Sequence, residues 1–119
     1  MVIYSPLNEE GCYGENGQIY QYAWKFYNDQ SETVKKEFDR CIVALSVEGR
    51  LSPPDGKNIA PNLFEIRVRV SPNQYRMFYC YVDPNDVWIL SGYVKKTQKA
   101  PLAEINKAKK IKRAVEKGV

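Results

Sequence analysis

The segment LFEIRVRVSPNQYRMFYCYVDPNDVWILSGYV (residues 63–94) decides the fold, because hydrophobic and polar residues begin to alternate there with a period of two. The apolar positions of its first part, residues 63–70, are Phe64, Ile66, Val68 and Val70. The charged positions between them are Glu65, Arg67 and Arg69. Successive side chains of a strand point to opposite faces, so this pattern predicts a strand with one buried face.

Two short turn sequences divide the remainder of this segment into further strands. SPNQ (71–74) and DPND (83–86) combine proline with asparagine or aspartate, which favours tight turns. Residues 75–82 and 87–94 are rich in aromatic and β-branched side chains, which favours strands. We therefore expect three antiparallel strands joined as a meander.

Two helices are predicted before the meander. Aromatic residues recur at helical spacing in residues 18–28: Tyr20, Trp24 and Tyr27. Ser31 is a favourable N-cap for a second helix, and Gly49 is a natural terminator for it. The apolar stripe of this second helix consists of Val34, Phe38, Cys41, Ile42 and Leu45.

The remaining segments complete an α+β fold. VIYSP (2–6) predicts a short first strand, EEGCYGENG (9–17) an exposed glycine-rich turn, and the proline-rich LSPPDGKNIAPN (51–62) a loop. Pro101 suits the first turn of a last helix. Its apolar stripe consists of Leu102, Ile105, Ala108, Ile111 and Val115. We expect one domain, residues 1–119, with two N-terminal helices packed on a small antiparallel sheet and a basic C-terminal helix.

The charge of the chain is distributed unevenly. Residues 1–94 hold nine basic and twelve acidic side chains, whereas residues 95–119 hold nine basic and two acidic ones. The last part therefore carries a net charge of +7, and the whole chain +4. A basic block of this kind attracts polyanions such as nucleic acid, although a solvated, lysine-rich helix face would show the same composition.

Histidine and cysteine restrict the possible chemistry. The chain contains no histidine, so a catalytic triad with a histidine base is excluded. Its three cysteines, Cys12, Cys41 and Cys80, match neither a disulfide framework nor a zinc pattern. We expect no metal and no cofactor. The chain also has no signal-peptide pattern and no long apolar run, so we expect a cytoplasmic protein that does not associate with membranes.

Five cations are expected to converge at one rim of the sheet. Arg67 and Arg69 share a face, Arg76 follows the first turn, and Lys95 and Lys96 leave the end of the third strand. Unpaired arginines are costly to bury, so this face must meet water or an anion, and guanidinium groups bind phosphate with two parallel hydrogen bonds. The alternative is that these arginines form ordinary surface pairs with Glu65. The register, which decides whether Arg76 joins the face of Arg67, stays open.

Several motifs resemble a known toxin family. The matching features are L-x-x-P-x-x-K (Leu51, Pro54, Lys57), LFEIR (63–67), YRMFY (75–79), and an aromatic–x–KKTQK–x–P signature (93–101) followed by Glu104. From about residue 34 to 110 the chain is similar to the phage-derived, HigB-like branch of the RelE/ParE toxin superfamily.

This resemblance implies the toxin of a type II toxin–antitoxin pair, a metal-independent endoribonuclease that cuts mRNA on the ribosome. The RNA 2′-OH would attack the adjacent phosphate, with Arg67 and Arg76 as phosphate clamps. Lys95 and Lys96 would stabilise charge and donate a proton. Further RNA contacts would come from Lys57, Arg69, Tyr93 and Lys99. Tyr93 would stack on a base, or its position in the period-2 pattern would bury it. The implied partners are mRNA, the ribosome and an antitoxin, expected to be a helix-turn-helix protein encoded by the adjacent gene.

Two alternatives remain open. Relatives often supply a tyrosine or histidine from the last segment, whereas KAPLAEINKA (99–108) has neither. The chain could therefore be a non-catalytic nucleic-acid-binding protein or a ParE-type toxin directed at gyrase. The basic C-terminal segment could also serve only to dock an acidic antitoxin.

Overall fold

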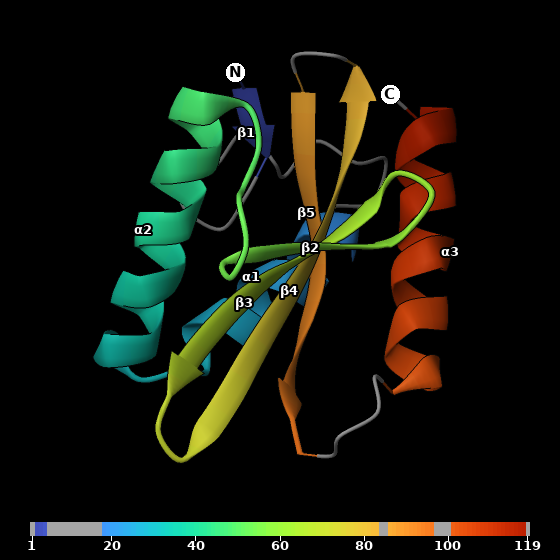
Figure 1. Cartoon of the computed structure of the whole chain (residues 1–119). Coiled ribbons are helices and arrows are strands. Elements are labelled where there is room, and N and C mark those ends of the chain that lie inside the picture. The colour runs from blue at the N-terminus through green and yellow to red at the C-terminus, as the bar shows by residue number, and fades with distance from the viewer. Residues whose placement is uncertain (1, 5–17, 84–85, 97–100, 119) are drawn as a thin grey trace.

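The computed structural model has an α+β fold in which three helices surround a sheet (Figure 1). It describes residues 2–4, 18–83, 86–96 and 101–118. The elements are β1 (Val2–Tyr4), α1 (Gln18–Asn28), α2 (Glu32–Glu48), β2 (Gly56–Ala60), β3 (Leu63–Val70), β4 (Asn73–Asp83), β5 (Asp86–Lys95) and α3 (Leu102–Gly118). The predicted glycine-rich turn, residues 9–17, lies outside the described residues.

The meander of β3, β4 and β5 forms the centre of the sheet, as predicted. Both pairs are antiparallel, and the strand order is β1-β5-β4-β3-β2. The predicted alternation of β3 is confirmed, because Ile66 and Val68 are buried in the core beneath α1 and α2. Phe64 and Val70 pack at the margin of the same core.

The second predicted helix is confirmed as α2, including its ends. The Ser31 side chain accepts a hydrogen bond from the Val34 backbone N–H at 3.3 Å, and Gly49 ends the helix with a φ of 77°. A positive φ at this position suits glycine, because its missing Cβ removes the steric penalty. The predicted apolar stripe is buried: Val34, Phe38, Cys41, Ile42 and Leu45.

Helix α1 occupies the predicted residues, but its buried face differs from the prediction. Ala23 and Tyr27 are buried and Phe26 is half-buried, so positions i, i+3 and i+4 face the sheet. Trp24, which was expected in the stripe, is 40% exposed and stacks on the Tyr27 ring with 6.2 Å between centroids.

Two further features correct the predicted architecture, and the structure also places the last helix. The expected loop at 51–62 contains the strand β2, which is possible because the prolines flank Gly56–Ala60 and none lies within it. The sheet is mixed, because β1 pairs with β5 in parallel. Helix α3 packs on the opposite face from α1 and α2, through Ala108, Ile111 and Val115. Leu102, expected in the stripe of this helix, is exposed.

Gly92 allows α1 to pack closely against β5. A Cβ atom at this position would lie 2.7 Å from Cγ of Phe26, which is too close for a side chain held in the core. We expect Gly92→Ala to destabilise the protein by about 1–3 kcal/mol. Urea unfolding followed by circular dichroism measures this loss. The double variant Gly92→Ala/Phe26→Leu should recover part of it, and no recovery would show that the clash lies elsewhere.

No helix among the described residues combines the length and apolar character needed to cross a membrane.

Candidate functional site

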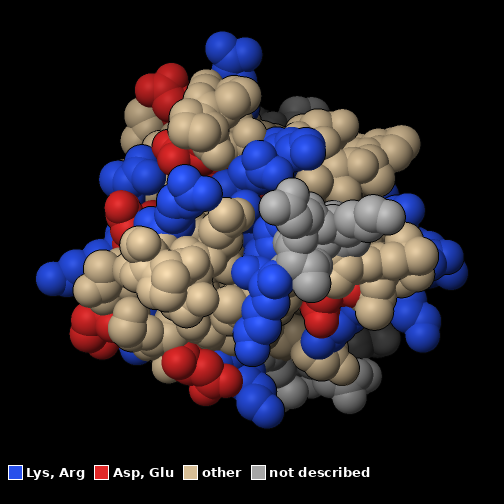
Figure 2. Space-filling model, turned by 60° about the horizontal axis from the view of Figure 1, so that its bottom comes forward, with Lys and Arg blue, Asp and Glu red and all other residues tan. Residues whose placement is uncertain are grey.

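A cationic face lies at the end of the molecule where β3 turns into β4 and where β5 finishes. Helix α3 packs on the central part of its sheet face, in one apolar cluster with Leu63, Phe78 and Leu90. Figure 2 shows Lys and Arg side chains gathered in a band across this end, with Asp and Glu mostly to its sides. The excess of positive charge favours an anionic ligand.

The strand register brings the predicted arginines together. Arg67 lies directly opposite Arg76, and Arg76 lies opposite Tyr93. Two residues further along, Gln74 of β4 lies between Arg69 of β3 and Lys95 of β5 in the same way. Positions that are paired across an antiparallel sheet share a face. The question that the sequence left open is thus answered, since Arg76 shares the face of Arg67.

A buried carboxylate organises these cations. Glu65 is only 2% exposed, and its Oε1 atom accepts a hydrogen bond from Nε of Arg67 at 3.1 Å. The same oxygen lies 3.3 Å from Nε of Arg76 in an ion pair, and Oε2 accepts a hydrogen bond from the Tyr93 hydroxyl at 3.0 Å. Because one carboxylate contacts two guanidinium groups, the cluster keeps one net positive charge.

Glu65 was underestimated at the sequence level. It was considered only as a surface partner of the arginines, whereas the structure buries it between them. The available signal was an acidic residue two positions before Arg67 in a predicted strand, which places both side chains on one face.

Arg76 is held more rigidly than the other cations. It is 5% exposed, its Nη1 donates to the Tyr75 carbonyl oxygen at 3.2 Å, and its Nη2 donates to Oε1 of Gln74. Burial lowers the pKa of this guanidinium, Glu65 opposes the shift, and Arg67 contributes to it. An arginine remains charged despite such a shift, so Arg76 is a fixed positive charge beneath the surface.

The Tyr93 ring is buried and stacks on Phe78 with 5.5 Å between centroids. It is therefore not an open platform for an RNA base, in contrast to the expected stacking role. Burial, together with the charge and hydrogen bond of Glu65, raises the pKa of the Tyr93 hydroxyl. The hydroxyl thus stays protonated and orients the Glu65 carboxylate.

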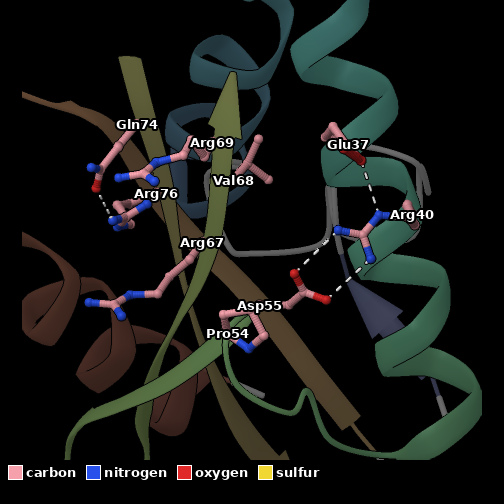
Figure 3. Close-up of a pocket in the computed structure, with 9 residues that line it drawn as sticks. All are labelled: Glu37, Arg40, Pro54, Asp55, Arg67, Val68, Arg69, Gln74 and Arg76. Atoms are coloured by element: carbon pink, nitrogen blue, oxygen red, sulfur yellow. Dashed lines mark hydrogen bonds and ion pairs between the residues drawn. The ribbon is translucent and has the colours of Figure 1, made fainter. Parts of the chain in front are cut away.

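A hollow runs beside β3, where residues 67–70 extend beyond Gly56, the first residue of β2 (Figure 3). Its volume is about 470 Å³, and its lining consists of Glu37, Arg40, Pro54, Asp55, Arg67, Val68, Arg69, Gln74 and Arg76. On one side of the hollow, the charge of Arg40 is compensated by two carboxylates. Arg40 donates to both oxygens of Asp55, at 3.2 and 3.3 Å, and to Glu37 at 3.0 Å. In Figure 3 the three arginines from β3 and β4 extend away from this pair.

The other predicted residues are placed as follows. Lys95 is half-exposed at the end of β5, and Lys96 is exposed directly after it. Lys57 is exposed on β2, opposite Glu65 in the register. Lys99 lies outside the described residues. Within the described ranges, no cluster of three or more His, Cys, Asp or Glu side chains forms a candidate metal site.

Two comparisons with known proteins bear on this site. A family model described as "Phage derived protein Gp49-like" matches residues 25–113. The match covers the end of α1, all of α2, the strands β2 to β5 and most of α3, and it therefore includes every described residue of the cationic face. A comparison with curated proteins gave no match.

Proposed function

The chain belongs to the Gp49-like family of phage-derived proteins, within the RelE/ParE-like toxin superfamily, and from this premise we propose that it is an mRNA-cleaving toxin. Members of this family are often toxins of toxin–antitoxin systems, which suggests a cognate antitoxin as partner. The finer proposal is a HigB-like endoribonuclease that acts on mRNA at the ribosome, in the cytoplasm.

One observation carries this proposal: four cations lie close together on one sheet face, next to the buried carboxylate of Glu65. They are Arg67, Arg76, Arg69 and Lys95. The Arg67 side chain is partly exposed and the Arg69 side chain is exposed, whereas the Arg76 side chain is buried. Preorganised guanidinium groups stabilise the charge that develops on a reacting phosphate, because they need no reorganisation during the reaction.

The proposed reaction is an internal transesterification of RNA. The 2′ oxygen forms a bond to phosphorus and releases its proton to solvent, while the bond between phosphorus and the 5′ oxygen breaks. The products are a 2′,3′-cyclic phosphate and a 5′-hydroxyl end. Arg67 and Arg76 stabilise the phosphate, and Lys95 and Lys96 stabilise charge and protonate the leaving 5′ oxygen.

The two lysines are tested as a pair. We expect Lys95→Ala/Lys96→Ala to lower the cleavage rate about 10- to 100-fold, because charge stabilisation and general-acid catalysis are both weakened. Initial rates on a reporter mRNA measure the effect. Lys35→Ala/Lys36→Ala is the matched control, since it removes two adjacent lysines from α2. Equal losses in both variants would assign the effect to net charge alone.

The proposed function itself is tested by the integrity of mRNA in a translation extract. The expected result is cleavage by the wild-type protein, with 2′,3′-cyclic phosphate ends and dependence on added ribosomes. Intact mRNA after incubation with wild-type protein would refute the nuclease assignment. Cleavage without ribosomes would retain the nuclease and remove the ribosome from the proposal.

A second candidate follows from the burial of Arg76. Three of its guanidinium nitrogens already contact protein groups, an arrangement that also suits a binding surface without catalysis. Salt-sensitive RNA binding with intact RNA would favour this reading. Inhibition of DNA gyrase would favour a ParE-type target instead.

A further inference from the structure

A second basic hollow lies between α1 and α3, apart from the cationic face. Its volume is about 750 Å³. Its lining residues are Tyr22 from α1 and, from α3, Ala103, Asn106, Lys107, Lys110, Ile111, Arg113 and Ala114. None of these residues lines the hollow beside β3. We call this second hollow the α1–α3 groove.

The charge of the α1–α3 groove is uncompensated within the described residues. Lys107, Lys110 and Arg113 line it, no Asp or Glu does, and none of the three forms an ion pair with a described carboxylate. The pattern differs on another side of α3, where Lys112 pairs with Glu116 at 3.2 Å.

An exposed aromatic ring completes the groove. Tyr22 is 47% exposed, and Nζ of Lys107 lies 4.4 Å from its ring centroid in a cation–π contact. Ala103 and Ala114, which also line the groove, have small side chains that leave it open. Cations next to an accessible aromatic face form the combination by which proteins bind single-stranded nucleic acid, through phosphates and base stacking.

We propose that the α1–α3 groove binds a segment of single-stranded RNA, at a site separate from the cationic face. Lys107, Lys110 and Arg113 contact successive phosphates, and a base stacks on Tyr22. The choice of RNA as ligand rests on the proposed function. The exposed ring favours RNA over an acidic peptide, because bases stack on an aromatic face whereas carboxylates do not.

The test is fluorescence anisotropy with a labelled 2′-O-methyl oligouridine 12-mer, which binds but lacks the attacking hydroxyl. We expect Lys107→Ala/Lys110→Ala to weaken binding about tenfold, and the slope of log K against log salt to fall by about 1.4 in magnitude. Lys36→Ala/Lys109→Ala removes the same charge outside the groove and should change the affinity less than about twofold. Tyr22→Ala should weaken binding about fivefold or more, and Tyr22→Phe should retain it.

Two outcomes would overturn the inference. Equal losses in both lysine pairs would indicate diffuse attraction without a groove. Lysine-dependent binding of a polyglutamate peptide, combined with unchanged RNA binding, would assign the groove to an acidic protein partner.

The Arg76→Ala variant separates this inference from the nuclease proposal, because it should bind the 12-mer through the groove even if it cuts no mRNA. If the wild-type protein binds in this way and cleaves nothing, only the nuclease proposal fails.

Discussion

Arg76→Ala is expected to lower the rate of mRNA cleavage about 100- to 1,000-fold, the range found when one preorganised donor to a developing negative charge is removed. Arg76 supplies a fixed positive charge opposite Arg67, and Gln74 and Glu65 hold it in place. Initial cleavage rates in a translation extract measure the effect, together with growth after induced expression, which the variant should restore.

Three comparisons make this result interpretable. Arg76→Lys keeps the charge but loses the planar fork, so it should recover only a small part of the activity. Lys36→Ala removes an exposed cation of α2 from outside the cationic face and should retain full activity. The urea midpoint of each variant separates loss of chemistry from loss of folding. Undiminished cleavage by folded Arg76→Ala would exclude this residue from the site.

Glu65→Gln is expected to destabilise the protein by about 3 kcal/mol, because it leaves two guanidinium groups facing each other without a countercharge. This loss corresponds to a urea midpoint lower by about 1–3 M. Cleavage should fall as well, since Glu65 positions Arg67 and Arg76. Glu48→Gln, at an exposed position near the end of α2, is the matched control and should shift the midpoint very little.

The double variant Glu65→Leu/Arg76→Met tests whether the destabilisation arises from unpaired charge. Replacing both members of a buried ion pair by apolar residues of similar volume is often neutral or stabilising. We therefore expect the double variant to unfold at a higher urea concentration than Glu65→Gln, while remaining inactive. A double variant less stable than Glu65→Gln would show that packing, and not charge, makes Glu65 important.

Much of the fold could be predicted because its strongest signals are local. The alternation in β3, the Ser31 cap and the Gly49 terminator depend on residues close in sequence, and the structure confirms them. The parallel pairing of β1 and the side of the sheet covered by α3 depend on tertiary contacts, which leave no periodic signal. The strand β2 was missed because prolines on both sides of it gave the stronger local signal.

The site could be predicted as a set of residue types but not as an arrangement. The alternation placed Arg67 and Arg69 on one face, whereas the position of Arg76 required the register of the hairpin. Burial of Glu65 could not be read from the pattern, because Glu65 occupies the nominally polar side of β3. For Tyr93 the pattern allowed burial as well as exposure. The hydrogen bond between Glu65 and Tyr93 links β3 to β5 across β4, a distance that no short motif encodes.

The parallel pairing of β1 with β5 bears on how the chain folds as it is synthesised. Val2 pairs with Asp86 and Tyr4 with Trp88, whereas β3, β4 and β5 pair with their sequence neighbours through short turns. Contacts between distant residues carry a larger loop-closure entropy and form later than local ones. On a translating ribosome, β1 must therefore wait until β5 has emerged from the exit tunnel. The sheet therefore gains its edge strand β1 only after the meander of β3, β4 and β5 has formed.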